Sequence, residues 1–225
     1  MADLNDQQIA RLSPDKRLLL ERLAGGLHGA LPGEVLLEQR MTDGPAALSF
    51  AQERLWLIDR LQPDDPLYNV FEAWRLAGPL QFEALRAAIN ELIERQGALR
   101  TGFHETESGP VQRLASVAFQ CAFVDLSCLP ESERWSACRA RLDAVVHRPF
   151  DLAVPPLMGA VLLRLRDDEH VLLVVMHHMV SDGWSRGVFV RELGQAYSAH
   201  VQGRDSGLPL LPFQYADYSE WQRRW

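Results

Sequence analysis

Two adjacent histidines, followed four residues later by an acid and a glycine, are the residues of this chain best suited to chemistry. His177 and His178 end a short apolar run that begins at His170, and Asp182-Gly183 open a helical pattern. The apolar run is mostly β-branched and predicts a strand. Side chains alternate between the two faces of a strand, so His177 and His178 point to opposite sides. This geometry favours one catalytic imidazole, which titrates near pH ~6.5 and accepts a proton at neutral pH.

Other chemistries fit the same segment poorly. A metal site needs a third convincing ligand beside His177, His178 and Asp182, and the alternating strand geometry separates the two imidazoles. We therefore expect no metal site. Ser181 and Ser185 lack the Gly-x-Ser-x-Gly pattern of an exposed serine nucleophile.

Four segments, in chain order, resemble one family. His177-His178-x-x-x-Asp182-Gly183 resembles the signature of the condensation domains of nonribosomal peptide synthetases, which chloramphenicol acetyltransferase-like acyltransferases share. Ser49-Phe-Ala-Gln-Glu-Arg-Leu-Trp56 resembles the family's opening Ser-x-Ala-Gln-x-Arg-Leu-Trp. Leu99-Arg-Thr-Gly-Phe103 resembles the end of Arg-His-Glu-x-Leu-Arg-Thr-x-Phe, and Tyr215-Ala-Asp-Tyr-Ser-Glu-Trp221 resembles Tyr-x-Asp-Tyr-x-x-Trp. The resemblance covers about residues 46–225.

The chain also departs from the family. Gln96-Gly97 stands where the family has His-Glu, so the resemblance assigns that pair no role. The family has two lobes of similar fold, with the tunnel and active site between them. This sequence ends at Trp225, just past the last motif. We interpret residues 46–225 as the N-terminal lobe alone, and we expect it to be inactive without the second lobe.

The resemblance implies that the family's reaction is peptide-bond formation. The amine of a carrier-bound aminoacyl group attacks the thioester of a carrier-bound donor. His178 is the implied catalytic residue. A free α-amine has a pKa of ~7.7–8.0, so much of it is already neutral at pH 7. His178 is therefore expected to take the proton from the tetrahedral intermediate or to orient the amine, worth ~10²–10⁴ in rate.

The remaining motif residues are expected to support His178. His177 faces the interior and holds a hydrogen bond. Asp182 caps the following helix and forms a buried ion pair, either with Arg100, placed on the face of its strand opposite to Leu99 and Phe103, or with an arginine of the second lobe. Gly183 leaves room for the phosphopantetheine arm or acyl chain, and its N–H is a weaker candidate for an oxyanion donor. Trp184 and Ser185 are expected to line the substrate tunnel, whereas Ser49, Gln52, Arg54, Trp56, Tyr215, Asp217 and Trp221 are expected to be structural.

Two other functions stay open. One is a related enzyme, an epimerization domain or a CoA-dependent acyltransferase, although the segment from Ser49 to Trp56 favours condensation. The other is a module without activity that docks carrier or synthase partners. In each case the expected partners are donor and acceptor peptidyl or acyl carrier proteins, whose 4′-phosphopantetheine arms bring the substrates, and no directly bound cofactor is expected. Residues 1–45 are expected to dock an upstream synthase subunit or to pack on the domain.

Composition narrows the class of protein. The 225 residues are 47% hydrophobic and 24% charged, as in an ordinary globular domain with one core. The net charge of −7 disfavours nucleic acid and anionic membranes as partners. No apolar run reaches the ~20 residues of a membrane span, and no signal peptide is apparent, so a cytoplasmic location is expected. The odd number of cysteines without a Cys-x-x-Cys indicates neither a disulfide framework nor a zinc site: Cys121, Cys128 and Cys138.

The chain reads as an N-terminal helical segment, residues 1–45, followed by an α/β (α+β) body, residues 46–225. Ser13-Pro14-Asp15 predicts a helix start, and Arg40–Pro45 reads as a boundary. In the body, apolar periodicity predicts a mixed sheet flanked by helices. Helices are expected after Ser49, over Leu85–Ile93, over 131–147 and after Gly183. Ser49-x-x-Gln52 resembles a capping box, and Ala51, Leu55 and Ile58 are expected to form the buried stripe of the helix that follows. The helix over 131–147 is expected to pack through Trp135, Cys138, Leu142, Val145 and Val146. Strands are expected near residues 69–76, 99–103, 111–115, 119–124, 157–166 and 170–177.

Overall fold

The computed structural model describes residues 36–42 and 44–225. Leu37–Trp225 forms one compact unit. The predicted helix at Ser13 and most of the predicted segment 1–45 lie outside the described residues. The account below concerns Leu37–Trp225.

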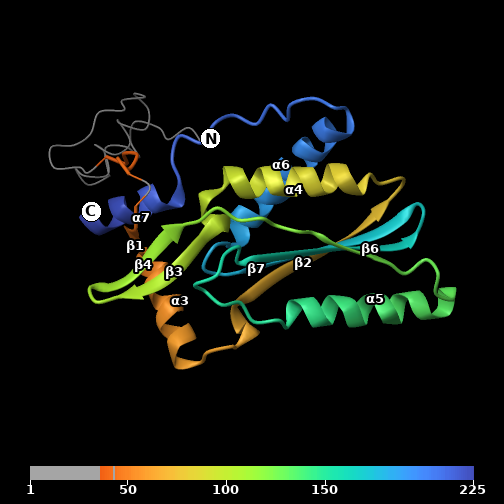
Figure 1. Cartoon of the computed structure of the whole chain (residues 1–225), viewed down its shortest axis with the longest axis horizontal. Coiled ribbons are helices and arrows are strands. Elements are labelled where there is room, and N and C mark those ends of the chain that lie inside the picture. The colour runs from red at the N-terminus through yellow and green to blue at the C-terminus, as the bar shows by residue number, and fades with distance from the viewer. Residues whose placement is uncertain (1–35, 43) are drawn as a thin grey trace, which may run out of the picture. The chain divides into compact units, whose positions relative to one another are not determined.

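A four-stranded mixed sheet is the centre of this unit, with strand order β2-β7-β6-β5. β2 (Asn69–Ala77) and β6 (Met158–Arg166) both pair antiparallel with β7 (Glu169–His177), and β5 (Ala122–Asp125) pairs parallel with β6. All nine residues of β7 are buried, because strands cover both its edges and helices cover both its faces (Figure 1). The run that ends in the two histidines is therefore the best-protected strand of the fold.

Helices cover the two faces of this sheet. α4 (Phe82–Arg95) and α6 (Gly183–Val201) lie on one face, and α5 (Glu131–Val146) lies on the other (Figure 1). Alternate residues of β7 enter two separate apolar clusters, as the period of two in a strand requires. Leu172 and Val174 pack with Ile89 and Leu193 from α4 and α6, whereas Leu173 packs on the α5 side.

A second, three-stranded antiparallel sheet lies beside the first, with strand order β1-β4-β3. It is formed by β1 (Ala46–Ala47), β3 (Thr101–Thr106) and β4 (Gly109–Leu114). α3 (Phe50–Leu61) and α7 (Tyr215–Arg224) lie next to this sheet. Two 3₁₀ turns, η1 (Pro66–Tyr68) and η2 (Gly97–Arg100), come directly before β2 and β3, respectively. A third apolar cluster contains Leu48, Phe103, Leu157 and Met179, so it joins this sheet to the segment after β7.

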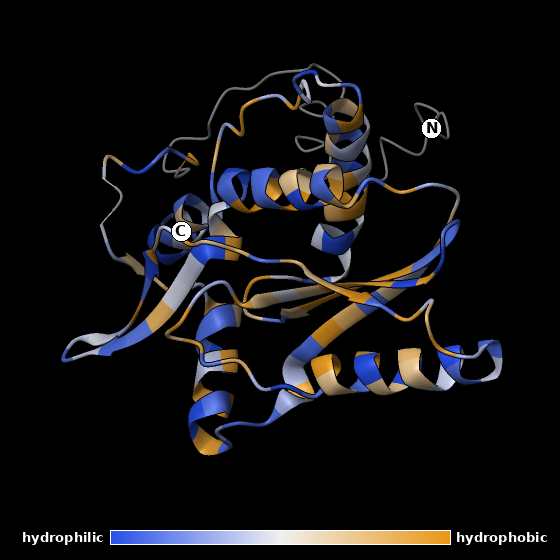
Figure 2. Ribbon diagram, turned by 45° about the vertical axis from the view of Figure 1, so that its right-hand side comes forward, coloured by the Kyte–Doolittle hydropathy of each residue, from blue (hydrophilic) through white to orange (hydrophobic). Residues whose placement is uncertain are grey.

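The predicted class, an α/β lobe with a mixed sheet, is confirmed, and most predicted elements are present. The hairpin at Asp167-Asp168 forms as expected. Two strands begin later than predicted. Leu99 and Arg100 belong to η2, so β3 starts at Thr101, and Phe119 is buried in an irregular segment before β5. Figure 2 shows the strands of the large sheet mostly in hydrophobic colours, while α5 alternates between the two extremes.

Two predicted buried positions are wrong. In α3 we expected Ala51 in the interior, but Ala51 is exposed and Gln52 is buried. In α5 Trp135 was expected to carry the packing, yet its side chain is 50% exposed and lies 5.8 Å from the guanidinium of Arg75. Hydrophobicity alone therefore does not identify the inward residues of these helices: the buried Gln52 is hydrogen-bonded, and the exposed Trp135 lies beside a cation.

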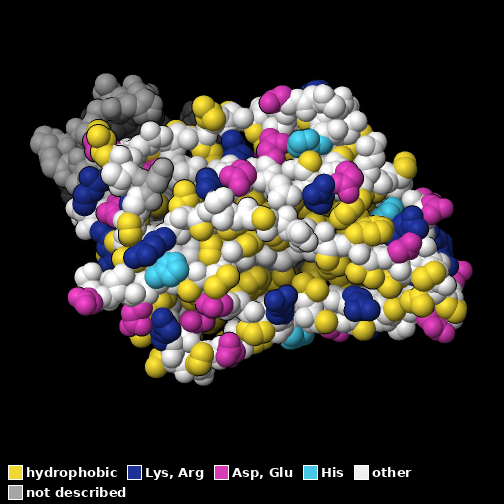
Figure 3. Space-filling view, in the orientation of Figure 1, with side chains coloured by type: hydrophobic (Ala, Val, Ile, Leu, Met, Phe, Trp, Pro, Cys, Tyr) yellow, Lys and Arg dark blue, Asp and Glu magenta, His cyan; other side chains and the backbone are white. Residues whose placement is uncertain are grey.

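The surface mixes charge with apolar side chains. Figure 3 shows hydrophobic side chains across the middle of one face, in the band between α4 and α5. Phe123 of the edge strand β5 is partly exposed and contacts Phe82 of α4, with ring centroids 5.0 Å apart. Among the described residues, no helix is long and apolar enough to cross a membrane.

Candidate active site

The two histidines lie where β7 ends. The His177 backbone N–H donates to the carbonyl of Leu157, and the His178 N–H donates to the carbonyl of Tyr68. His177 is 3% exposed and lies between the rings of Tyr68 and Phe150, each with its centroid 6.4 Å away. His178 is exposed. The predicted separation is confirmed: one imidazole is in the interior and the other faces solvent.

The ring of His178 is held by its own loop. Its Nδ1 lies 2.6 Å from the carbonyl oxygen of Ser181. A carbonyl oxygen only accepts hydrogen bonds, so Nδ1 carries the hydrogen and donates. In the neutral ring this leaves Nε2 with its lone pair. The exposed ring is thus oriented to accept a proton at Nε2.

His177 has the opposite arrangement. The backbone N–H of Met179 donates to His177 Nδ1 over 3.1 Å, so this nitrogen must be unprotonated. Burial, and to a smaller extent the neighbouring His178, lowers the pKa of His177 to about 4. His177 is therefore neutral at pH 7 and acts as a hydrogen-bond acceptor, the structural role expected for it.

Asp182 corrects one prediction and confirms another. It caps α6 as expected: its Oδ1 accepts the Ser185 N–H at 2.8 Å, and the Asp182 N–H donates to Ser185 Oγ at 2.7 Å. It is exposed, however, and forms no ion pair with a described residue. The Ser185 hydroxyl, followed by the Ser185 N–H, holds the pKa of Asp182 below its usual value. In the described structure the helix cap stabilises this carboxylate, and the alternative partner, an arginine of the second lobe, stays a prediction.

Arg100 is not the partner of Asp182. It ends η2 instead of lying on a strand, because the chain turns before β3 begins. Its Nε lies 3.9 Å from Glu94 Oε2 and is buried without a hydrogen bond. Gln96 and Gly97, which stand where the family has His-Glu, have structural roles here. Gln96 donates to Glu192 at 3.0 Å, and the Gly97 N–H donates to Gln214 at 2.8 Å.

The first turn of α6 is open. A Cβ added at Gly183 would meet only Arg186 Nη2, at 3.9 Å, so the space expected there is present. Trp184 is 84% exposed, whereas the Ser185 hydroxyl is engaged with Asp182. Sequence reasoning missed Arg186, whose Nη1 lies 3.0 Å from Glu72 Oε1 of β2. In the sequence, Arg186 is marked only by its position three residues after Gly183. An arginine at that spacing is too common to predict a functional residue.

The helix expected to be merely structural reaches the histidine loop. Ser49 and Gln52 form the capping box predicted at the start of α3. The buried Gln52 side chain also donates to the carbonyl of Met179, at 3.3 Å. Ser49 Oγ lies 3.0 Å from the Tyr215 hydroxyl, so α7 joins the same network. The Ser49–Trp56 and Tyr215–Trp221 segments therefore meet beside the histidine segment.

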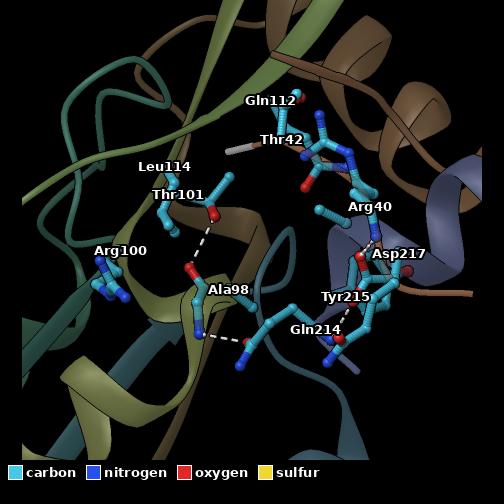
Figure 4. A pocket seen from close by; sticks show the side chains of 13 residues that line it. Arg40, Thr42, Ala98, Arg100, Thr101, Gln112, Leu114, Gln214, Tyr215 and Asp217 are labelled. Carbon is cyan, nitrogen blue, oxygen red and sulfur yellow. Dashed lines mark hydrogen bonds between the residues drawn. The ribbon is translucent and has the colours of Figure 1, made fainter. Parts of the chain in front are cut away.

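One cavity bounded by described residues has no wall from His178. It has a volume of about 360 Å³, and its walls come from residues 39–42, η2, β4 and the start of α7. Figure 4 shows Gln214 and Asp217 on one side of this cavity and Thr101 and Leu114 on the other. Asp217 accepts the N–H of Arg40 at 2.8 Å and that of Gln214 at 2.7 Å, so it fixes the wall. Among residues 36–42 and 44–225, no three His, Cys, Asp or Glu side chains form a metal-binding group.

Comparison with known proteins identifies a family. The family model described as Condensation domain matches residues 43–225. The chain is 42% identical over 225 residues to phosphinothricin tripeptide synthetase PhsC of Streptomyces viridochromogenes, covering 100% of this chain and 21% of that protein. It is 40% identical over 184 residues to the isonitrile lipopeptide synthase of Mycobacterium tuberculosis, covering 80% of this chain and 7% of that protein.

Solved structures agree. The starter condensation domain of rhizomide synthetase RzmA is 26% identical, with a TM-score of 0.69, over 74% of this chain and 40% of that one. The first condensation domain of the calcium-dependent antibiotic synthetase shares the fold at 24% identity, with a TM-score of 0.69, over 75% of this chain and 40% of that one. The chain thus spans about a fifth or less of the curated relatives described above and 40% of these two solved domains.

Proposed function

Because this chain belongs to the condensation domain family, we propose that it takes part in amide-bond formation between two carrier-bound groups, with His178 as the catalytic residue. One observation carries the assignment to His178. Its ring is exposed at the end of a fully buried strand, and the Ser181 carbonyl fixes Nδ1 as the donor. A base tethered through one nitrogen presents the other to a substrate in a defined direction.

The proposed step begins with the neutral amine of the acceptor aminoacyl group. Its nitrogen attacks the thioester carbonyl of the donor, forming a C–N bond and a tetrahedral intermediate. His178 Nε2 takes a proton from the ammonium nitrogen of that intermediate. The C–S bond then breaks, and the proton passes to the departing sulfur as the phosphopantetheine thiol. The products are the amide and a free thiol arm, so no oxidant, reductant or metal is needed.

Both substrates are proposed to arrive on 4′-phosphopantetheine arms of donor and acceptor carrier proteins. The exposed first turn of α6 supports access, because Gly183 leaves space next to the motif and Trp184 projects from it. Asp182, Gly183 and Ser185 are proposed to shape this turn, with Asp182 and Ser185 acting through the helix cap. The upstream synthase subunit, the absence of a bound cofactor and the cytoplasmic location stay predictions.

The test uses the full-length protein, wild type and His178→Ala, with separately loaded donor and acceptor carriers. Intact mass spectrometry follows transfer of the donor group to the acceptor carrier. We expect transfer in the wild type and a loss of ~100-fold or more in the variant, with unchanged folding. Transfer at the wild-type rate in His178→Ala would exclude His178 from the chemical step.

The two alternatives predict different products. An epimerization or CoA-dependent acyltransferase activity would give α-carbon exchange or acyl transfer from CoA without an amide between carriers. A docking module would bind a loaded carrier and give no transfer in the wild type with any donor. Mass spectrometry detects transfer of a donor group or of an acyl group from CoA, which change the mass of the acceptor carrier by different amounts. Epimerization is detected by running the assay in D₂O, where α-carbon exchange adds deuterium to the carrier-bound group, and a docking module changes no carrier mass.

A further inference from the structure

Met179, the residue after His178, has both of its backbone polar groups held by buried side chains. Its N–H donates to His177 Nδ1 at 3.1 Å, and its carbonyl accepts from Gln52 Nε2 at 3.3 Å. The Met179 side chain is itself buried in the third apolar cluster, with Phe103 and Leu157. The backbone is therefore fixed immediately beyond the exposed His178.

The other side of His178 is fixed as well, since its own N–H donates to the Tyr68 carbonyl at 2.8 Å. Backbone held on both sides of a residue restricts the direction in which its Cβ points. A displacement of ~1 Å at a catalytic group costs on the order of 10²-fold in rate. The bonds that hold Met179 are thus able to affect chemistry without touching a substrate.

Of the two side chains that hold Met179, Gln52 is the one that comes from a distant element, α3. It is 3% exposed, and its Oε1 accepts the Ser49 N–H at 3.0 Å. Gln112 of β4 donates to the Ala47 carbonyl at 2.8 Å and to Ser219 Oγ at 2.7 Å, and it approaches Gln52 Oε1 at 3.4 Å. The amide of Gln52 is thereby oriented, with its oxygen toward Ser49 and its nitrogen toward the histidine loop.

We propose that Gln52 is a positioning residue for the condensation reaction, acting through the Met179 carbonyl to orient the loop that carries His178. This inference rests on the proposed function. A capping box alone needs only Oε1, which accepts the N–H of Ser49. The cap does not need the Nε2 donor, which instead forms the hydrogen bond to the Met179 carbonyl. Removing only that donor separates the two roles.

Gln52→Glu makes this separation. Glutamate is close to isosteric and keeps the acceptor for Ser49, but its carboxylate at neutral pH donates nothing to Met179 and faces a carbonyl oxygen. Full-length protein is assayed for transfer between loaded carriers at saturating substrate. We expect kcat to fall ~10-fold or more while KM for the loaded carriers stays within ~3-fold, since the carriers do not touch Gln52.

The matched control is Gln214→Glu. Gln214 Oε1 accepts the Gly97 N–H at 2.8 Å and its Nε2 donates to the Arg95 carbonyl at 3.2 Å, so this variant also keeps an acceptor and loses a donor to a backbone carbonyl, but these bonds involve neither Gln52 nor the histidine loop. We expect this variant to lower Tm and to keep kcat within ~3-fold at temperatures where it is folded. Equal losses of kcat in both variants would overturn the proposal, because they would indicate a general loss of packing. If the buried charge prevents folding, Gln52→Met replaces Gln52→Glu and is compared with Ser49→Ala, which removes the Ser49 Oγ acceptor of the same capping box and leaves the Gln52 donor to Met179 in place.

Hydrogen–deuterium exchange gives a second readout that does not depend on activity. The peptide covering residues 177–182 is expected to exchange faster in Gln52→Glu than in wild type and to be unchanged in Gln214→Glu. Absence of transfer in the wild type would refute the proposed function, and exchange would then decide whether Gln52 holds the loop. Wild-type transfer, inactive His178→Ala and fully active Gln52→Glu would refute this inference alone.

Discussion

His177 and His178 carry their hydrogens on opposite ring nitrogens. His177 Nδ1 accepts the Met179 N–H, whereas His178 Nδ1 donates to the Ser181 carbonyl. The two rings sit on consecutive residues and differ because β7 ends between them, so one remains among buried side chains and the other turns outward. His177 thus supplies a hydrogen-bond acceptor that holds the loop, whereas His178 keeps an acceptor nitrogen, Nε2, for a substrate.

The first prediction concerns these tautomers. Long-range ¹H–¹⁵N NMR spectra of the histidine side chains, recorded at a pH where both rings are neutral, are expected to show the Nε2–H form for His177 and the Nδ1–H form for His178. His178→Asn identifies the second set of signals by their loss. An Nε2–H form for His178 would contradict the orientation proposed for catalysis, because no lone pair would face the substrate.

The second prediction is a loss of stability in acid caused by His177. Its pKa is about 4 in the folded chain and ~6.5 in the unfolded chain, so the unfolded state binds more protons between these values. Stability is therefore fully present above pH ~6.5 and is lost as the pH falls toward 4. The depression corresponds to ~3 kcal/mol at most. Urea unfolding at a series of pH values measures it.

The control for the acid effect is His177→Asn. Its amide oxygen is able to accept the Met179 N–H but does not titrate in this range. The part of the pH slope between 6.5 and 4 that belongs to His177 should vanish, while His147→Asn, at an exposed position, should leave the slope in place. A slope unchanged in His177→Asn would assign the acid sensitivity to other groups.

The sequence predicts the histidine strand well because local pattern and tertiary environment agree there. The apolar run from His170 reads as a strand, and β7 is buried on both faces. Patterns also located α4, whose inward residues Leu85, Ala88, Ile89, Leu92 and Ile93 are all buried. In these elements hydrophobic burial decides the orientation, and hydrophobicity is legible in one dimension.

The sequence fails where a polar contact between distant segments decides the outcome. Nothing in the segment around Gln52 shows that its amide reaches Met179, which is 127 residues away. Alternation places Arg100 on a strand, but the hydroxyl of Thr101 donates back to the Gly97 carbonyl and a 3₁₀ turn forms instead. The motif predicts a buried ion pair for Asp182, but whether its carboxylate is buried depends on surroundings that the motif does not contain.

The third prediction separates a cap from an ion pair at Asp182. Asp182→Ala removes the acceptor for the Ser185 N–H and should cost about 1 kcal/mol in the free energy of unfolding. Asp182→Asn keeps a capping oxygen without the charge, so it should stay within ~0.5 kcal/mol of wild type. Chemical denaturation of the 225-residue chain measures both. An equal cost in Asn and Ala would show that the charge, and not the cap, stabilises this turn.

The fourth prediction concerns the three cysteines. Burial raises the pKa of Cys121 to about 11 and also raises that of Cys138, whereas Cys128 is exposed. Thiolates are the reactive form, so the native chain is expected to react rapidly with Ellman's reagent at Cys128 alone. Denatured protein should titrate all three thiols, and Cys128→Ser should abolish the rapid phase. A second rapid thiol in the native chain would contradict the burial of the other two.

The fifth prediction compares two glycines that differ in what surrounds them. A Cβ at Gly102 of β3 would lie 2.8 Å from the Ala153 carbonyl oxygen and 3.0 Å from Pro155 Cδ. The neighbouring Phe103 N–H bonds to the Leu152 carbonyl at 2.8 Å, so this segment is held against the strand and has little room to yield. Gly102→Ala should therefore lower the free energy of unfolding by ~1–3 kcal/mol.

Gly194, in the interior of α6, has nothing within 4 Å of an added Cβ. Gly194→Ala removes conformational freedom from the unfolded chain and creates no clash, so it should raise stability by ~0.5–1 kcal/mol. Thermal and urea unfolding of the two variants should thus shift in opposite directions. A stabilising Gly102→Ala would mean that the segment around Ala153 yields to an added methyl group, and it would contradict the close packing of that segment against β3.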